Sequence, residues 1–508
     1  IITVTNELAN KTSAGHDNIS INLIKKIIPY VSIPLSKLIN ASFEIGTVPD
    51  QLKIARVCPI FKSGDPSNFT NYRPISVLPG FSKIYEKLVH TRLMSYLTKH
   101  SVLTCNQFGF RSNHDTSLAV ADMIDRVTDK LEDGEFCLGM FVDLSKAFDT
   151  LDHTVLLSKL EFYGIRGKAL DWFRSYLSNR QQYVQLNGVK SRLSKIKTGV
   201  PQGSILGPLL FLLYINDIVN VSHYLHLILF ADDTNVFVSH KDLNSLQIVS
   251  NTELPKLVQW FKVNKLSLNI TKTNYMLFSP NSTCKNKGFG SFTIQLNGIN
   301  IEHVHNTKFL GVYIDDKLKW DKHIHEISAK ISKNIGIMSR VSYKVSTKIL
   351  LNLYYTHVFP YLNYCNFIWS AASLTVLNKL IVLQKRALRI LSKSSYLAHT
   401  DPLFQYYRLL KLNDIRNFQI SGFMFRFVNG MLPVGFEHYF EAVSDTHHYD
   451  TRSVSNSALK IVYAKTNRRK QTIKIIGPYV WNRIPIHIRQ LPSFSVFKRH
   501  LKYYLVTA

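Results

Sequence analysis

Residues 136–314 carry the strongest constraint on the fold, because short apolar strand patterns alternate there with amphipathic helix patterns. The apolar run at 136–144 has an aspartate at its next-to-last position, and Asn-Gly dipeptides at 187–188 and 297–298 are typical of hairpin turns. We expect strands at 136–144, 183–186, 225–230, 235–238, 292–296, 299–304 and 309–314, and helices at 153–162, 168–177 and 204–218. Hairpin-linked strands with separate helices predict an α+β fold with an antiparallel sheet.

The flanking regions are predicted to be mainly helical. Apolar spacing indicates helices at 19–45 and 81–99. Beyond residue 319 strand patterns become rare, and one face of a long helix is marked by Ile324, Ile327, Ile331, Ile335 and Met338. Further helices are expected at 347–368 and 374–391, followed by a tail punctuated by proline.

The 508-residue chain is strongly basic, with 62 Lys and Arg against 34 Asp and Glu and a net charge of +28. Residues 321–508 hold 27 basic and 8 acidic residues, so +19 of this charge falls there and +9 in residues 1–320. Such an excess is typical of proteins that bind a polyanion, since neutralised phosphates release counterions, but a basic soluble protein of another kind is the alternative. With 45% hydrophobic residues the chain can form several cores, and its length indicates three or four structural units.

Five cysteines are scattered without a CxxC pair, which argues against a disulfide framework or a zinc knuckle and favours an intracellular protein with reduced thiols. The longest apolar run, at 205–215, is well short of the roughly 20 residues that span a bilayer, and no signal peptide is recognisable. We therefore expect no membrane partner. The chain begins at Ile1 in the middle of a pattern, which indicates a fragment of a longer product.

Three aspartates at predicted strand ends could carry chemistry. Asp232 and Asp233 form the bend of an apolar hairpin, where two like charges are costly unless a divalent cation neutralises them; a solvated turn is the alternative. Asp143 ends the strand at 136–144, and neighbouring strands would bring it to Asp232, 89 positions later. Such carboxylates could hold two Mg²⁺ ions about 3.5–4 Å apart, an arrangement that catalyses phosphoryl transfer.

A series of motifs runs through the first two thirds of the chain: SAGHDNI at 13–19, PIFKSGD at 59–65, NYRPIS at 71–76, NQFGFR at 106–111, FVDLSKAFD at 141–149, GVPQGS at 199–204, FADD at 230–233, NKLSLN at 264–269 and KFLG at 308–311. In this order and spacing they resemble the reverse transcriptases of non-LTR (LINE-type) retrotransposons, in particular the jockey-like group. The resemblance covers about residues 12–315.

The resemblance implies a right-hand polymerase, with fingers and a palm followed by a helical thumb and a basic C-terminal region. The implied boundaries are 1–135 for an N-terminal extension and fingers, 136–315 for the palm with the remaining fingers, 316–400 for the thumb and 401–508 for the C-terminal region. The reverse transcriptase domain would lie at about 40–315.

By the same resemblance, Asp143 and Asp232 are the metal-binding aspartates of an RNA-directed DNA polymerase. Asp233 is implied to be their less strictly required neighbour, and the Leu144 carbonyl a main-chain metal ligand. The implied cofactor is two Mg²⁺ ions, or Mn²⁺ in their place. Lys272 resembles the lysine that protonates the departing pyrophosphate.

The resemblance also implies a site for the incoming nucleotide. The triphosphate would be held by Lys62, Arg73 and Arg111, and Arg suits phosphate because its planar fork donates two hydrogen bonds. Phe148 matches the aromatic gate that excludes a ribose 2′-OH, and Gln202 with Gly203 lies in a glycine-flexed loop placed against nucleotide and template. The alternatives are surface ion pairs for the cations, a core position for Phe148 and a helix-entry turn for the loop.

Basic residues of the C-terminal third are expected to contact nucleic acid, namely Lys385, Arg386, Arg389, Arg468 and Arg469. Aromatic side chains lie among Lys and Arg between residues 467 and 499, at Tyr479, Trp481, Phe494 and Phe497. This composition suits base stacking, although the aromatic rings could equally form a core. The pair His447-His448 with Asp450 lacks the partners of a metal site, and we expect a polar loop there.

The leading hypothesis is an RNA-directed DNA polymerase that works by target-primed reverse transcription. Its partners would be dNTPs, a template RNA that is the element's own transcript, and a DNA primer or target. We expect no room for the endonuclease of relatives before residue 12, so that the chain would polymerise without making its own primer, or the endonuclease is missing from this fragment. An intron maturase or viral RNA polymerase is the alternative enzyme, although Phe148 and FADD in place of GDD argue against the viral case. A non-catalytic RNA-binding scaffold is disfavoured by the intact Asp143 and Asp232. Family resemblance implies a cytoplasmic ribonucleoprotein and a nuclear site of integration, and the oligomeric state stays open.

Overall fold

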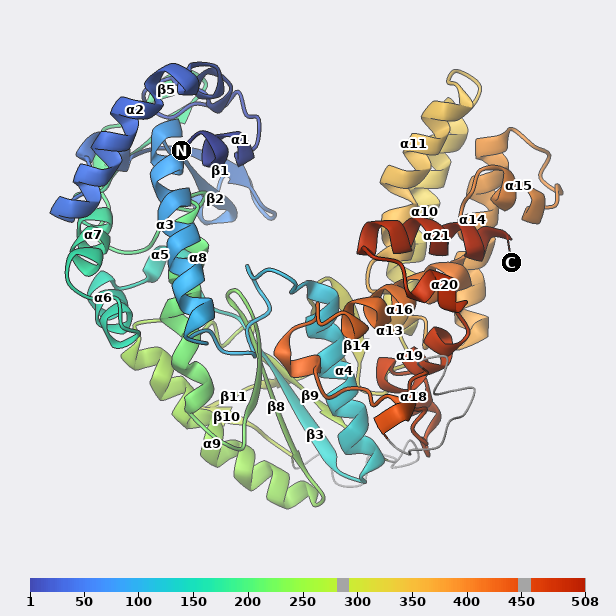
Figure 1. Ribbon diagram of the computed structural model, residues 1–508. Coiled ribbons are helices and arrows are strands. Elements are labelled where there is room, and N and C mark those ends of the chain that lie inside the picture. The colour runs from blue at the N-terminus through green and yellow to red at the C-terminus, as the bar shows by residue number, and fades with distance from the viewer. Residues whose placement is uncertain (281–291, 446–457, 508) are drawn as a thin grey trace. The chain divides into compact units, whose positions relative to one another are not determined.

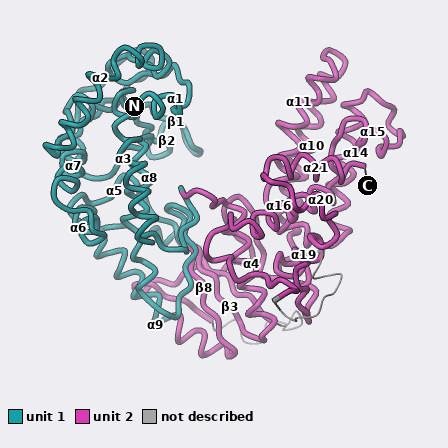
Figure 2. Tube along the Cα trace, viewed as in Figure 1, with its two compact units in different colours: residues 1–110, 142–234, 251–273 teal, residues 111–141, 235–250, 274–508 magenta. Residues whose placement is uncertain are grey.

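The computed structural model describes residues 1–280, 292–445 and 458–507. The chain forms two compact units (Figure 2): unit 1 comprises residues 1–110, 142–234 and 251–273, and unit 2 comprises residues 111–141, 235–250 and 274–508. These units interleave along the chain, and the consecutive domain boundaries expected from the sequence stay a prediction. Cys284, His447, His448 and Asp450 lie outside the described residues.

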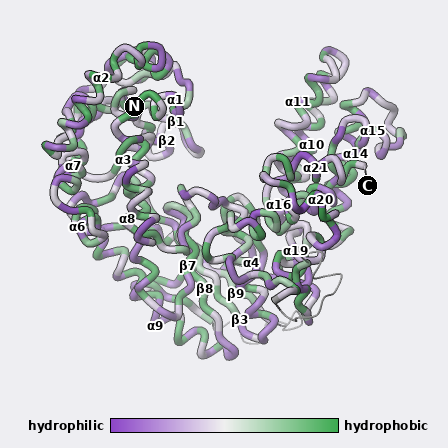
Figure 3. The backbone as a smooth tube through the Cα atoms, in the orientation of Figure 1, coloured by the Kyte–Doolittle hydropathy of each residue, from purple (hydrophilic) through white to green (hydrophobic). Residues whose placement is uncertain are grey.

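The N-terminal part of unit 1 is helical, as predicted. Its helices are α1 (Ile2–Glu7), α2 (Ile21–Ile45) and α3 (Gly80–Lys99) (Figure 1). The Ser20 hydroxyl caps α2 by accepting a hydrogen bond from the Leu23 N–H (3.3 Å), and Gly46, with φ of 76°, ends the helix. Apolar side chains of α2 and α3, among them Ile24, Ile28 and Ile84, form a buried cluster. Figure 3 shows the alternation of hydrophobic and hydrophilic residues along α2 that such one-sided burial requires.

Unit 1 contains a sheet with the strand order β2-β1-β4-β5, in which β6 also pairs with β4. Its strands are β1 (Ile54–Phe61), β2 (Tyr72–Val77), β4 (Gln181–Leu186), β5 (Val189–Lys190) and β6 (Ser194–Lys195). Strand β1 is antiparallel to β2 and parallel to β4. The predicted hairpin turn is confirmed, since Asn187 and Gly188 join β4 to β5 with φ of 48° and 86°.

The remaining elements of unit 1 lead to the strand ends that carry the aspartates. They are α5 (Ala147–Thr150), α6 (His153–Phe162), α7 (Lys168–Leu177), α8 (Leu206–Ile215), the 3₁₀ helix η3 (Asn216–Asn220) and β7 (His226–Phe230). Nearly every side chain of α8 is buried, which explains why its sequence is apolar on all sides. The helix predicted at 204–218 is therefore confirmed as α8 followed by η3.

Unit 2 contains the predicted antiparallel strands. In its sheet the order is β12 (Glu302–His303), β9 (Asn274–Phe278), β3 (Phe136–Val142) and β8 (Asp233–His240), and β3 pairs antiparallel with β9 from Cys137–Phe278 to Phe141–Asn274. The last residue of β3 and the first two of β8 already belong to unit 1, and helix α9 (Leu243–Val263) passes from unit 2 back into unit 1. A short hairpin, β10 (Gln295–Leu296) and β11 (Ile299–Asn300), turns at Asn297-Gly298 as predicted.

The single strand predicted at 309–314 is wrong. The structure has two strands there, β13 (Asn306–Phe309) and β14 (Val312–Asp315), which pair antiparallel. The turn between them consists of Leu310 and Gly311, both left-handed with φ of 43° and 85°. A leucine rarely adopts this conformation, so the apolar pattern hid the turn.

The rest of unit 2 is helical among the described residues, apart from short bridges. Its helices are α4 (Thr116–Glu132), α10 (Asp321–Val341), α11 (Thr347–His357), α12 (Phe359–Asn363), α13 (Asn366–Trp369), α14 (Leu374–Ser392), α15 (Asp401–Tyr406), α16 (Leu412–Val428), α18 (Asn467–Lys470), α19 (Ile473–Asn482), α20 (Ile486–Arg489) and α21 (Phe494–Thr507). The helix expected at 347–368 is divided, because Pro360 restarts the chain as α12 and Cys365 has φ of 50°. In the described parts of the chain, no helix is both long and apolar enough to cross a membrane.

Candidate active site

Asp143 follows β3 directly and is held in place by the segment 267–273. Its N–H donates to the Thr273 hydroxyl (3.4 Å), and its carbonyl accepts from the Asn269 N–H (2.8 Å). Leu144 forms an isolated antiparallel bridge with Leu268, in which the neighbouring Ser145 N–H binds the Ser267 carbonyl (2.9 Å). The two backbone hydrogen bonds on either side of this bridge are made by the Asp143 carbonyl and the Ser145 N–H. The Leu144 carbonyl is used by neither of them.

Asp232 lies in the turn between β7 and β8, and Asp233 is the first residue of β8. Ala231, just before them, is left-handed with φ of 55°. The buried Gln107 fixes this turn, because its Oε1 accepts the N–H of Ala231 (3.0 Å) and that of Gly109 (2.8 Å). Sequence reasoning quoted Gln107 within a motif but assigned it no role.

The three aspartates influence one another electrostatically. Burial raises the pKa of Asp232, and the charge of Asp143 raises it further. The pKa of Asp233 is raised to about 6, chiefly because its carboxyl loses hydration and further because of the charges of Asp232 and Asp143. The residue as a whole is nevertheless exposed. Strand β3, which Asp143 follows, lies next to β8, which begins at Asp233, and this strand order agrees with the electrostatic effect; the role of these aspartates as metal ligands stays a prediction.

Two of the predicted basic residues act on the same carboxylates. Lys62 follows β1 and Arg73 lies on β2, opposite Ile60. Both are exposed, and the charges of both lower the pKa of Asp232 against the effect of burial. Lys62 has the same effect on Asp233. A carboxylate cluster thus lies beside cations that a phosphate could also bind.

No group of three or more His, Cys, Asp or Glu side chains within residues 1–280, 292–445 and 458–507 is arranged to hold a metal ion. Mg²⁺ does not need such a cage, because it keeps several waters and uses one or two carboxylates together with substrate phosphates. The oxygen donors of Asp143 and Asp232 suit this cation, since the repulsion that raises the pKa of Asp232 is the cost that a divalent ion would remove.

The Phe148 ring packs against two other aromatic rings. It stacks on Phe211 of α8 with ring centres 4.5 Å apart and an angle of 24°, and it meets the edge of Phe110 at 6.2 Å. The Phe148 carbonyl also accepts the Val200 N–H (2.9 Å). A half-buried ring on such supports can act as a steric wall.

The loop 199–204 is fixed by hydrogen bonds of Gln202 and by a close backbone approach at Gly203. The Gln202 Nε2 donates to Asp149 Oδ1 (2.8 Å), and the Gln202 carbonyl accepts the Ser76 N–H (2.7 Å). Gly203 has φ of 119°, and a Cβ there would lie 2.6 Å from the Ser76 carbonyl oxygen. Asp149 is therefore a positioning residue that sequence reasoning missed.

Behind this loop, a buried glutamate supports α8. Glu86 is 1% exposed, and its Oε2 accepts the N–H groups of Ile205 (2.5 Å) and Leu206 (3.4 Å) at the start of the helix. Tyr176 donates its hydroxyl to Oε1 (3.1 Å), and the fully buried Arg180 supplies a compensating charge. Burial nevertheless raises the pKa of Glu86. An acid within an apolar helix pattern at 81–99 was the signal that could have identified it.

The remaining predicted site residues lie in the segment that supports Asp143 or in unit 2. Lys272 is exposed in the turn whose Thr273 supports Asp143, and its role in proton transfer stays a prediction. Arg111 belongs to unit 2, and its contact with a triphosphate likewise stays a prediction. Arg386 and Arg389 of α14 line a basic cavity of about 440 Å³ that also includes Lys393, and Lys385 precedes them on the same helix.

The two C-terminal arginines have different surroundings. Arg468 lies near the Ser279 carbonyl (3.5 Å). Arg469 forms an ion pair with Asp129 of α4, and its side chain is only 15% exposed. This pairing competes with the nucleic-acid contact expected of Arg469, which stays a prediction.

The chain is similar to several known proteins. The family described as reverse transcriptase (RNA-dependent DNA polymerase) matches residues 60–314. The probable RNA-directed DNA polymerase from transposon BS of Drosophila melanogaster is 29% identical over 83% of this chain and 47% of its own length. The RNA-directed DNA polymerase from mobile element jockey of the same organism is 28% identical over 80% of this chain and 45% of its own length. A solved apo telomerase from Candida tropicalis is 13% identical, with a TM-score of 0.40, over 74% of this chain and 66% of that one.

The chain spans less than half the length of the two curated relatives described above. The family match covers half of the chain and includes Asp143, Asp232, Asp233 and the loop 199–204. The jockey-like resemblance expected from the motifs is confirmed, and the chain belongs to the reverse transcriptase (RNA-dependent DNA polymerase) family.

Proposed function

We propose that this chain is an RNA-directed DNA polymerase that adds dNTPs to a DNA 3′-hydroxyl on an RNA template. The observation that carries the proposal is the position of Asp143 directly after β3 and of Asp232 and Asp233 at the start of the neighbouring β8, where the charges of Lys62 and Arg73 also act. This arrangement suits phosphoryl transfer, where positioning and charge stabilisation provide most of the rate. Its relatives named for the BS and jockey elements support a role in a retrotransposon.

Each residue of the site has a proposed task. Asp143, Asp232 and the Leu144 carbonyl would hold Mg²⁺ or Mn²⁺, which supplies Lewis-acid activation of the 3′-hydroxyl and of the phosphates when bound. Lys62 and Arg73 would orient the triphosphate by charge-assisted hydrogen bonds, and Arg111 is proposed to join them. Lys272 would donate a proton to the departing pyrophosphate.

Sugar selection and template placement would depend on the rigid parts of the site. Phe148, supported by Phe211, would exclude a ribose 2′-OH by steric contact. Gln202, held by Asp149, would contact the nucleotide and template. In target-primed reverse transcription the primer would be a cut end of the target DNA, the template would be the element's transcript, and the work would be done in the nucleus.

Primer extension on an RNA template with dNTPs and Mg²⁺ tests the proposal. Asp232→Ala should abolish extension, whereas Asp171→Asn, a change to an exposed acid of α7, should leave it unchanged. No extension by the wild type, or equal extension by Asp232→Ala, would contradict the polymerase proposal.

A second readout tests the sugar gate. Phe148→Ala should raise the incorporation of ribonucleotides relative to deoxynucleotides, because the steric wall is removed. An unchanged ratio would show that Phe148 is a packing residue.

A further inference from the structure

The aromatic side chains that lie among basic residues in the C-terminal region have two kinds of surroundings. Trp481, Phe494 and Phe497 are part of the core: Phe425 packs on Phe497 with ring centres 4.4 Å apart and on Phe494 at 5.8 Å, and Trp481 meets Phe497 at 6.0 Å. For these three rings the core interpretation holds. Tyr479 differs, because 42% of its surface is exposed.

The guanidinium group of Arg483 lies over the face of the Tyr479 ring. The guanidinium carbon of Arg483 lies 3.9 Å from the centre of the Tyr479 ring, and the two residues lie one turn apart at the C-terminal end of α19. Arg483 is exposed, and no salt bridge to it occurs within the described residues. The pair forms a positively charged aromatic surface.

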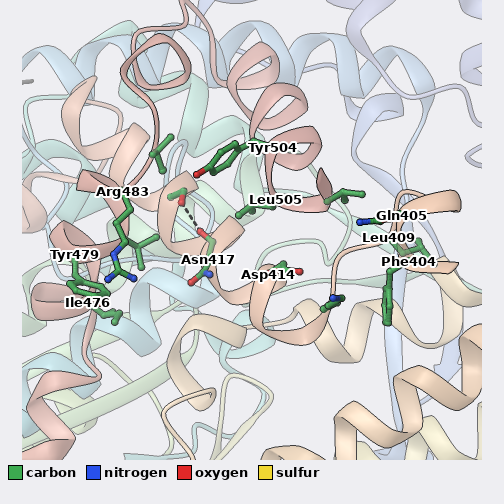
Figure 4. Close-up of a pocket in the computed structure, with 15 residues that line it drawn as sticks. Phe404, Gln405, Leu409, Asp414, Asn417, Ile476, Tyr479, Arg483, Tyr504 and Leu505 are labelled. Atoms are coloured by element: carbon green, nitrogen blue, oxygen red, sulfur yellow. Dashed lines mark hydrogen bonds between the residues drawn. The ribbon is translucent and has the colours of Figure 1, made fainter. Parts of the chain in front are cut away.

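This surface borders a cavity of about 490 Å³ within unit 2, between α15, α16, α19 and α21 (Figure 4). Asp414 and Asn417, three residues apart on α16, add a carboxyl and an amide to the wall, and Tyr504 of α21 adds a hydroxyl. Partial burial raises the pKa of Asp414. The volume falls within the range of about 300–1,000 Å³ found for small-ligand sites.

We propose that this cavity, which we call the Tyr479 pocket, binds one unpaired base of a single-stranded nucleic acid by stacking on the Tyr479–Arg483 surface. Unpaired bases stack on aromatic rings and on guanidinium planes, while polar groups contact their edges. The Asn417 amide can donate to a base edge and accept from it, and the charge of Arg483 suits the adjoining phosphate. Stacking is tolerant of sequence, since every base has a π face. The inference goes beyond the proposed polymerase reaction and does not require it.

The alternative is that Arg483 only interacts with the C-terminal end of α19, where a cation is favourable. Binding of labelled oligonucleotides of about 12 nucleotides to the full 508-residue chain distinguishes the two. Single-stranded RNA, single-stranded DNA and duplex RNA should be compared by fluorescence anisotropy at several salt concentrations. The two single strands share the base chemistry, and the tighter of them identifies the natural ligand.

Tyr479→Ala should bind single strands about ten-fold more weakly than the wild type, with an unchanged salt dependence, and should bind duplex RNA normally. Tyr503→Ala is the matched control, because Tyr503 is an exposed tyrosine of α21, 65% exposed, that does not line the pocket. Arg483→Ala should reduce both the affinity and the salt slope, the latter by about one. Thermal unfolding of each variant checks that the fold is intact.

Single-strand binding by Tyr479→Ala equal to that of Tyr503→Ala would overturn the inference. An equal loss on duplex RNA would also overturn it, since bases inside a duplex cannot stack on the pocket. Primer extension separates this result from the polymerase proposal. If the wild type extends primers but Tyr479→Ala binds single strands as the wild type does, only the pocket proposal is contradicted. If Tyr479→Ala loses single-strand binding but the wild type does not extend primers, only the polymerase proposal is contradicted.

Discussion

Replacing Gln107 by leucine should destabilise unit 1 and displace the turn that carries Asp232. Gln107 is 2% exposed, and its Oε1 accepts the N–H groups of Gly109 and Ala231. A leucine side chain is similar in size to glutamine and would fill the place of the lost oxygen in this buried position, so no water could replace it. Two buried donors left unpaired cost about 1–3 kcal/mol each. The added apolar burial of leucine offsets part of this, which gives a loss of about 2–4 kcal/mol in the free energy of unfolding.

Urea unfolding measures this loss, and primer extension measures its consequence for the site. Extension by Gln107→Leu should fall even where the variant is fully folded, since the Asp232 turn loses its support. An unfolding free energy of Gln107→Leu within about 0.5 kcal/mol of the wild type would refute the reasoning.

Three further changes test other supports. Gly203→Ala should reduce extension and stability, because φ of 119° disfavours alanine and the new Cβ would meet the Ser76 carbonyl oxygen at 2.6 Å; wild-type unfolding would contradict this. Glu86→Ala should lower the free energy of unfolding by about 3–5 kcal/mol, since Arg180 would stay buried without its countercharge, and a loss below about 1 kcal/mol would argue against that role. Burial raises the pKa of Asp125 to about 7, so the folded state binds its proton more tightly than the unfolded state. Its contribution to stability is then present at low pH and lost as the pH rises toward 7. In urea unfolding, the free energy of unfolding of Asp125→Asn should not show this decrease with rising pH.

Periodicity predicted those elements whose pattern is local. The helices at 19–45 and 81–99 and the strand at 136–144 are present because each has one or two faces that must be buried. The turn at Leu310-Gly311 was missed, since its leucine is left-handed and adds to the apolar pattern.

Contacts between residues far apart in sequence limited how much of the candidate site could be predicted. Motif spacing predicted that Asp143 and Asp232 meet, and the charge of Asp143 contributes to the raised pKa of Asp232, while their role in catalysis stays a prediction. The supports behind them were not predictable in the same way. Gln107 accepts a hydrogen bond from Ala231 over 124 positions, and Glu86 caps α8 over 119 positions, so neither contact leaves a local pattern.

The positive charge of the C-terminal third overstates the surface available to a nucleic acid. Residues 111–141 hold seven acidic and three basic residues, and α4 within this segment receives cations from the basic region. Asp129 pairs with both Arg469 and Lys474, the latter at 2.7 Å. Part of the net +19 is therefore neutralised inside unit 2 and stabilises the packing of α18 and α19 on α4. A cation that is exposed and stacked on an open ring, as Arg483 is on Tyr479, is a better guide to a binding surface than the count of lysines and arginines.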